Sequence, residues 1–238
     1  MLLPPSEGKA DGGGSRSGWD PTVGRFGRRL GDQRGEIVDA LSSNRGGDTR
    51  LLGVSGRHLD RAQIANSTLR GAPTLPAWRR YTGVVWDHLD PGSLSADARR
   101  RIVVVSGLLG LVRGDDPTPD YRLKMGASLA PMGKLSTWWR DDLTAALADL
   151  VRRPVGGRPV VLVDLLPQEH RAAIHVGQGL PTVVVDLVDP SGKPGGHAAK
   201  AAKGELAAAL LTDGLGALDE WHHARFDAIA TWPETAAR

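Results

Sequence analysis

The chain has 238 residues, of which 40% are hydrophobic and 24% charged, with a formal net charge of +3. This composition is typical of a globular protein with a sizeable core, and it excludes an intrinsically disordered chain. The chain has no cysteine, which excludes disulfides, thiolate metal centres and a cysteine nucleophile. Because the net charge is small, any nucleic-acid surface must arise from local clustering of basic residues.

Residues 1–5 read Met-Leu-Leu-Pro-Pro and lack the basic and apolar regions of a signal peptide. No stretch approaches the roughly 18 apolar residues that a membrane-spanning helix needs. We therefore expect a cytoplasmic protein without a membrane partner.

The first part of the chain is predicted to contain one short strand and several helices. Leu2 and Leu3 form the strand, and residues 12–18, rich in glycine and serine, are expected to form a flexible loop. The spacing of apolar residues and the glycines and prolines that interrupt it predict helices over residues 35–52 (with a break at 44–47), 60–69 and 78–89.

Farther along, strands alternate with helices. The β-branched run from Ile102 to Val105 is the strongest strand signal, and all the strands of this part are apolar throughout, so both their faces should be covered. The tryptophans, Trp86, Trp138 and Trp139 among them, are expected to pack in the core. Further strands are predicted over residues 160–163 and 182–185, and helices over 135–151 and 197–211. This order predicts a mixed α/β fold, with a central mixed sheet flanked by helices in a single compact domain over residues 1–238.

Ser106 and Gly107 follow the strongest strand and open the sequence Ser-Gly-Leu-Leu-Gly-Leu. Ligand sites of open α/β sheets tend to lie where strands end, and small residues let a ligand or another backbone come close. The alternative is a tight strand-to-helix turn without a ligand. Gly107 and Gly110 also have the Gly-x-x-Gly spacing of a helix-hairpin-helix DNA-binding module, which is a short match.

The proline-rich loop that follows presents Tyr121, Arg122 and Lys124 in a row. An arginine fork suits phosphate or carboxylate, and a tyrosine can stack or donate a hydrogen bond. Asp115 and Asp116 just before them are candidates for a metal ion, although a solvated acidic turn is more common. The histidines show no metal-ligand spacing and no dinucleotide fingerprint is present, so we predict neither a metal site nor a cofactor.

Gly8 and Lys9 resemble the end of a phosphate-binding loop, but Leu3 and Ala10 stand where that motif requires glycine and serine or threonine. Of that motif the chain keeps one lysine, which follows the first strand. It lies on the same face as Ser106 if the two strands are parallel.

Three more charged residues are candidates in the later part of the chain. Lys200 and Lys203 are three residues apart on an alanine-rich helix and therefore lie on one side of it. They can contact a phosphate backbone, line a pocket or form an ordinary solvated face. Glu169 is a candidate general base, or a carboxylate near a helix N-terminus.

Taken in order, these segments resemble the YaaA family of peroxide stress proteins. The matching segments are Leu-Pro-Pro-Ser-Glu-Gly-Lys at residues 3–9, Tyr-Thr-Gly-Val-Val-Trp at 81–86, residues 105–113 and 120–126, residues 135–139, a Leu-x-x-x-Glu pattern ending at Glu169, and Lys-Ala-Ala-Lys-Gly at 200–204. They extend from about residue 2 to residue 211, and the central block is too specific for a chance match.

The resemblance implies DNA binding and survival of peroxide stress, with less free iron and less oxidative DNA damage. It implies a fold with a helix-hairpin-helix-like element beside a positively charged cleft. Carried over residue by residue, it implies that the cleft is lined by Lys9, Ser106, Gly107, Gly110, Tyr121, Arg122, Glu169, Lys200 and Lys203.

The chain departs from the family pattern at several positions. Lys203 replaces an arginine, which removes a bidentate fork, and His170 stands where the family often has tyrosine. From Asp213 onward the family's closing strands are not evident, so residues 213–238 are expected to form a divergent tail.

Two functions follow from these observations. The first is a DNA-binding protein whose basic residues, Lys9, Arg122, Lys200 and Lys203, meet backbone phosphates with little sequence preference. The alternative is an enzyme that uses the same cleft on a nucleobase-like or phosphorylated small molecule, for example in a specialised biosynthetic pathway. A desolvated lysine can lose its proton near neutral pH and become a base or nucleophile. The catalytic candidates are then Lys9, Ser106, Glu169 and Lys200.

Overall fold

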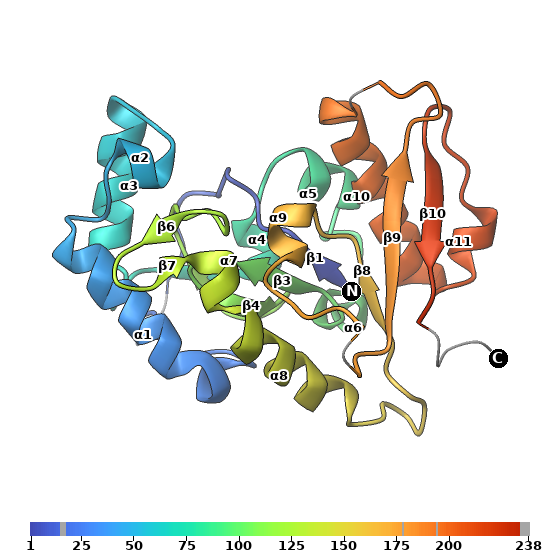
Figure 1. The fold of residues 1–238 in the computed structure, drawn as a ribbon, viewed down its shortest axis with the longest axis horizontal. Helices are drawn as coiled ribbons and strands as arrows, with labels where there is room; N and C mark the ends of the chain where they lie inside the picture. The colour runs from blue at the N-terminus through green and yellow to red at the C-terminus, as the bar shows by residue number, and fades with distance from the viewer. Residues whose placement is uncertain (15–17, 178, 194, 234–238) are drawn as a thin grey trace.

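A six-stranded mixed sheet forms the centre of the computed structural model, which describes residues 1–14, 18–177, 179–193 and 195–233 (Figure 1). Its strand order is β10-β9-β8-β1-β3-β4. The parallel strands are β1 (Leu2–Leu3), β3 (Val103–Ser106), β8 (Leu162–Asp164) and β9 (Thr182–Val188), and the antiparallel edge strands are β4 (Gly110–Arg113) and β10 (Asp227–Thr231). The predicted mixed α/β class is confirmed.

The short strand β1 lies between two parallel neighbours. Leu2 pairs with Val103 of β3 on one side and with Asp164 of β8 on the other. The carboxyl ends of β1, β3 and β8 therefore meet at one edge of the sheet, where ligand sites of α/β proteins usually lie. Of the candidate residues, Lys9, Ser106 and Glu169 follow or end these strands at this edge.

The buried strands form where the sequence is rich in β-branched residues. Every residue of β3 and β8 is buried, while β9 is buried only over its first part and is more exposed toward its end. The predicted strands are confirmed, with their ends shifted by at most three residues.

The helix α1 (Gly27–Ser43) begins at Gly27 rather than at the predicted Gly35. Its apolar face buries Leu30 and Leu41, and the buried Arg34 lies on the same side. The Arg34 guanidinium donates to the carbonyls of Leu109 (2.9 Å) and Leu111 (2.8 Å), which ties α1 to the turn between β3 and β4. Many charged residues surround Arg34, so the first part of this helix lacks a clear apolar periodicity in the sequence.

The predicted helix over residues 78–89 is wrong as a single element. It is divided into α4 (Ala77–Arg80) and α5 (Val84–Leu89). Between them Gly83 adopts φ 103°, a left-handed conformation that favours glycine, and Tyr81 pairs with Lys9 in an isolated β-bridge. The break therefore forms because residues 8–10 lie against this segment.

The remaining elements surround the sheet. The predicted helix over 135–151 is two helices that meet at Trp139, and the alanine-rich helix is confirmed as α10. These elements are α2 (Thr49–Leu52), α3 (Arg57–Ser67), β2 (Thr74–Pro76), α6 (Ala96–Arg100), β5 (Pro117–Pro119), β6 (Ser128–Leu129), β7 (Gly133–Lys134), α7 (Leu135–Trp138), α8 (Arg140–Val151), α9 (Gln168–Arg171), α10 (Gly196–Asp213) and α11 (Ala217–Glu220).

A glycine of α10 and the tryptophans of the core show how the helices pack around the sheet. A Cβ at Gly204 of α10 would lie 2.4 Å from the Val85 carbonyl oxygen, so glycine is what allows α10 and α5 to come this close. Trp86 and Trp139 are buried as expected, and Trp138 is partly buried against the same core.

The expectation that the chain lacks a strand after Asp213 is wrong, because β10 pairs with β9 along its whole length. Of the loop predicted over 12–18, residues 15–17 lie outside the described residues. Within the described part of the chain, no helix has the length and apolar character to cross a membrane.

Candidate functional site

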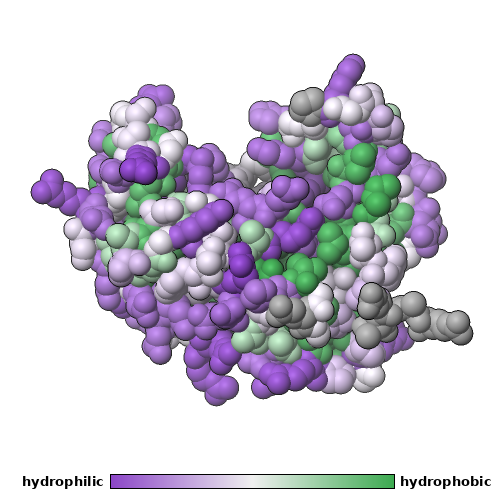
Figure 2. Space-filling view, in the orientation of Figure 1, coloured by the Kyte–Doolittle hydropathy of each residue, from purple (hydrophilic) through white to green (hydrophobic). Residues whose placement is uncertain are grey.

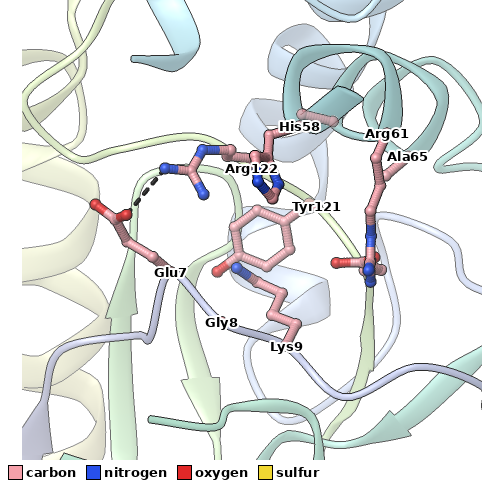
Figure 3. A pocket seen from close by; sticks show the side chains of 10 residues that line it. Glu7, Gly8, Lys9, His58, Arg61, Ala65, Tyr121 and Arg122 are labelled. Atoms are coloured by element: carbon pink, nitrogen blue, oxygen red, sulfur yellow. Dashed lines mark hydrogen bonds and ion pairs between the residues drawn. The ribbon is translucent and has the colours of Figure 1, made fainter. Parts of the chain in front are cut away.

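The molecule is hollowed between the part that carries α2 and α3 and the part that carries α10 and the tip of β9, and hydrophilic side chains gather in the hollow (Figures 1 and 2). A pocket of about 380 Å³ lies between α3 and the segment after β1 (Figure 3). Its lining residues are Glu7, Gly8, Lys9, His58, Arg61, Ala62, Ala65, Asp120, Tyr121 and Arg122.

One wall of the pocket is a face of α3. His58, Arg61, Ala62 and Ala65 have the i, i+3, i+4, i+7 spacing that places residues on one side of a helix. Sequence reasoning missed this wall, because an alternation of charged and small residues on a short helix is also typical of a solvated surface.

The opposite wall is the segment that follows β1. Lys9 pairs with Tyr81, and the amide of Ala10 donates to the Arg80 carbonyl at 2.8 Å. The buried Arg80 guanidinium in turn donates to the carbonyls of Ala10 and Gly12 and, across the pair β2–β5, to that of Thr118. These bonds hold the backbone on both sides of Lys9 in one conformation.

The side chain of Lys9 lies beneath the ring of Tyr121 (Figure 3). Its Nζ is 4.2 Å from the ring centroid and donates to the Ser6 carbonyl at 3.0 Å. Burial lowers the pKa of Lys9 to about 8; Asp120 and Glu7 oppose this shift, and the positive charges of Arg122 and Arg80 add to it. A sizeable fraction of the Lys9 side chains is therefore unprotonated near neutral pH.

Tyr121 separates this pocket from the end of β3. Its hydroxyl is 2.7 Å from the Ser106 Oγ and 2.8 Å from the Tyr81 hydroxyl. Burial raises the pKa of Tyr121 to about 12 and that of Tyr81 well above its usual range, so both phenols stay neutral. Ser106 itself is fully buried and accepts from the Leu109 amide, so it orients Tyr121 and does not line the pocket.

Arg122 and Lys124 share one carboxylate. Glu7 is 2.9 Å from the Arg122 guanidinium and 3.3 Å from the Lys124 ammonium, and its side chain is 64% exposed. Partial burial raises the pKa of Glu7, but the hydrogen bonds from Arg122 and Lys124 outweigh it and lower the pKa overall. The two cations are thus paired with a group that solvent can reach.

Arg122 also joins the pocket to the helices α2 and α3. Its Nε donates to the Leu52 carbonyl at 3.2 Å, and its backbone exchanges hydrogen bonds with the buried Asn66 of α3. On the other side of the pocket Arg61 pairs with Asp120, at 3.3 Å, and with Asp11. Lys9 and Tyr121 lie between Arg122 and Arg61 (Figure 3).

A glycine-flanked turn joins α2 to α3. It reads Gly53-Val54-Ser55-Gly56, with φ 64° at Gly53 and φ 54° at Gly56. No side chain caps the N-terminus of α3, and Arg50 and Arg57 on either side of the turn are exposed. The sequence analysis does not single out this Gly-x-x-Gly pair, although two glycines three residues apart between helical stretches are a visible signal for such a turn.

The turn that sequence reasoning did select has a different structure. Gly107 and Gly110 lie in a hairpin between the antiparallel strands β3 and β4, so the expected strand-to-helix turn is wrong, and this pair does not lie between helices. A Cβ on Gly107 would lie 2.8 Å from the Lys124 carbonyl oxygen, and one on Gly110 would lie 3.0 Å from the Trp139 ring. The close neighbours of these two glycines are therefore other residues of the chain.

Lys203 belongs to a second polar cluster, after β8. Its Nζ donates to the Leu165 carbonyl at 2.5 Å, beside the ion pair of the fully buried Asp164 with the partly buried Arg171 at 2.7 Å. Burial lowers the pKa of Lys203, which Asp164 opposes, and burial lowers the pKa of His170 to about 4. Lys203 thus ties α10 to the end of β8.

The remaining candidates lie outside the pocket. Lys200 is exposed on α10, and Glu169 is exposed with its carboxylate against the backbone of Gly126. Asp116 is not the solvated residue that we expected: it is buried and accepts from the amides of Arg25 and Arg113, each at 2.8 Å. Among the described residues, no group of three or more His, Asp or Glu side chains is arranged to hold a metal ion.

Comparisons with known proteins identify the family of the chain. The family model of the peroxide stress protein YaaA matches residues 1–230. A UPF0246 protein of Corynebacterium efficiens is 35% identical over 219 residues, which are 89% of this chain and 84% of that protein. A UPF0246 protein of Streptomyces coelicolor is 34% identical over 225 residues, 90% of this chain and 83% of the relative. The chain therefore belongs to the family of the peroxide stress protein YaaA.

Proposed function

We propose that this protein binds DNA as part of the response to peroxide stress, with backbone phosphates against the turn between α2 and α3 and against the neighbouring pocket. The observation that carries this proposal is the turn Gly53-Val54-Ser55-Gly56, which joins two helices beside the cations Arg122 and Lys124. We assign the helix-hairpin-helix-like element that the family resemblance implies to these two helices.

The backbone of the turn is suited to a phosphate. Two glycines with positive φ leave its surface without Cβ atoms at Gly53 and Gly56, so a phosphate can approach the main chain. The N-terminus of α3 follows, and the partial positive charge and free amides of a helix N-terminus favour anions. The Leu59 and Asp60 amides donate to the Gly56 carbonyl, and with no capping side chain the amides before them are open to a ligand.

The cations near the turn reinforce this preference. A phosphate can replace the exposed Glu7 carboxylate on Arg122 and Lys124, because both groups are anionic oxygen acceptors. Arg50 and Arg57 are exposed on either side of the turn and have no ion pair within the part of the chain that the structure describes. Since such contacts involve the backbone of DNA, we expect weak sequence preference and steep salt dependence.

The test is a fluorescence-anisotropy titration with duplex, bubble and single-stranded DNA at about 50 mM and about 200 mM salt. We expect salt-sensitive binding that the double variant Arg50→Ala, Arg57→Ala weakens strongly. The matched control is Arg28→Ala, Arg158→Ala, which removes two exposed arginines from the start of α1 and the loop after α8, away from the turn (Figure 1). Equal effects of the two double variants, or no salt-sensitive binding, would contradict the proposal.

A small phosphorylated or nucleobase-like ligand is the second candidate. The pocket of about 380 Å³ is within the usual size of small-molecule sites, and Lys9 and Tyr121 offer a cation and a ring at its base. If all forms of DNA fail to bind, isothermal titration with nucleotides against wild type and Arg122→Ala tests this alternative directly.

A further inference from the structure

Lys9 is the lysine that lines the pocket. Lys9 and Lys203 each donate to a backbone carbonyl, but of the two it is Lys9 that lines the pocket. Its backbone is held on both sides by the bonds to Arg80 and Tyr81, and its side chain lies against the Tyr121 ring. A lysine that is fixed in a pocket and shielded from water has the arrangement of a nucleophilic amine.

Burial makes the neutral form of Lys9 accessible. With a pKa of about 8, roughly a quarter of the Lys9 amines are unprotonated at pH 7.5, against roughly one in a thousand for an ordinary lysine. Arg122 and Arg80 favour this neutral form, while Asp120 and Glu7 disfavour it. The neutral amine has a lone pair that can attack a carbonyl carbon.

The surroundings of the pocket define which carbonyl compound fits. The Arg122–Glu7 pair lies on one side of Lys9 and Arg61 on the other, so a ligand over Lys9 meets a cation at each end (Figure 3). An abasic deoxyribose in DNA has this pattern: a phosphate on each side and, in its open-chain form, an aldehyde at C1′. Having lost its base, such a nucleotide leaves the stack at a lower cost than an intact one.

We infer that Lys9 forms a Schiff base with the C1′ aldehyde of abasic sites and that the protein cleaves the DNA strand there by β-elimination. This inference rests on the proposed DNA binding and names the substrate class of the same site.

The reaction balances without an oxidant or a reductant. The Lys9 nitrogen bonds to C1′, and one of its protons moves to the carbonyl oxygen. A second proton, from solvent, lets the hydroxyl leave as water, which leaves an iminium ion. A base then removes a C2′ proton, the electrons form the C2′–C3′ double bond, and the C3′–O bond breaks to release the phosphate. Water finally hydrolyses the iminium, which frees Lys9 and an unsaturated aldehyde. Asp120, His58 and Glu7 line the same pocket and are candidate proton acceptors.

The test is borohydride trapping. Wild-type protein is mixed with a labelled duplex that contains one abasic site, with and without sodium borohydride, and the products are separated on a denaturing gel. We expect a covalent protein–DNA band that requires both borohydride and the abasic site, and strand cleavage when borohydride is omitted. Reduction of the iminium to a stable amine is specific to a Schiff base.

Two variants at position 9 and one control variant identify the amine that forms the Schiff base. Lys9→Ala and Lys9→Arg should both lose the covalent band, and Lys9→Arg keeps the positive charge and therefore keeps more DNA affinity. Lys193→Ala, which removes an exposed lysine from the loop after β9, should keep the band. Persistence of the band in both Lys9 variants would overturn the inference.

Anisotropy with the same abasic duplex tests DNA binding separately from Schiff-base formation. If the wild type binds this duplex but gives neither a trapped band nor strand cleavage, the Schiff-base inference is wrong and DNA binding stands. If it binds neither intact nor abasic DNA, the proposed function fails, and this inference fails with it. Circular dichroism melting of each variant shows whether a loss is due to misfolding.

Discussion

The ammonium group of Lys9 lies 4.2 Å from the centroid of the Tyr121 ring. The first residue follows β1 and the second follows β5, and more than a hundred positions of the chain separate them. Their contact has two consequences: it places a cation at the base of the pocket, and it holds Tyr121 so that its hydroxyl reaches Ser106 and Tyr81.

We expect Lys9→Met to stabilise the protein at pH 7. The folded-state pKa of Lys9 is about 8, below the ordinary value of 10.5, so at neutral pH the folded state holds a proton that burial disfavours. The unfolded state binds more protons between pH 8 and pH 10.5, and wild-type stability should rise relative to the variant in this range.

Urea unfolding of both proteins from pH 7 to pH 10.5 measures this difference. The advantage of Lys9→Met should be at most about 3 kcal/mol at pH 7 and should shrink toward zero as the pH passes through 8 and approaches 10.5. A difference that does not depend on pH would show that Lys9 has an ordinary pKa.

Tyr121→Phe should destabilise the protein by about 1–3 kcal/mol, because it leaves the buried Tyr81 hydroxyl without its partner and removes the bond to Ser106. The Phe ring keeps the contact with Lys9, so the pocket should keep its shape. Urea unfolding at pH 7 gives the free energy. An unchanged free energy of unfolding would mean that water replaces the lost hydroxyl.

Glu7→Gln should strengthen DNA binding by about threefold to tenfold, because it removes an exposed carboxylate that competes with phosphate for Arg122 and Lys124. Anisotropy at low salt measures the change. The matched control is Glu220→Gln, which removes an exposed carboxylate from α11 and should leave the affinity unchanged. If Glu7→Gln weakens binding, Glu7 contributes to the site in another way.

Gly53→Ala should weaken DNA binding while costing about 1 kcal/mol of stability. Gly53 has φ 64°, which an L-residue adopts with strain, and the nearest neighbour of an added Cβ is the flexible end of Lys124 at 3.3 Å. The control, Gly35→Ala in the middle of α1, should raise stability by about 0.5–1 kcal/mol, because alanine favours the helix and the site has room. Equal affinities for Gly53→Ala and wild type would exclude the turn from the binding surface.

The strongest sequence predictions concern elements whose signal is local. The valine run of β3, the alanine-rich α10 and the short strand at Leu2 are all present, because β-branched and alanine-rich stretches have strong preferences of their own. The family resemblance likewise depends on short motifs that can be read in order along the chain, and the family model over residues 1–230 confirms it.

The site depended on contacts that the sequence does not display. Sequence reasoning placed Ser106, Lys9 and Lys203 in one cleft, but only Lys9 lines the pocket: Tyr121 covers Ser106, and Lys203 donates to Leu165. The α3 wall with His58 and Arg61 was missed, because a polar helix face looks the same whether it meets solvent or a pocket.

By itself, then, the sequence determined the alternation of strands and helices, the family, and the residue types available for the site. The tertiary structure decided the break between α4 and α5, the burial of Asp116 and the grouping of Lys9 with Tyr121 and Arg122. The physical reason is the range of the interactions. Backbone preferences act over a few neighbouring residues, whereas these features depend on hydrogen bonds and packing between segments that are far apart in the chain and meet only when the sheet is assembled.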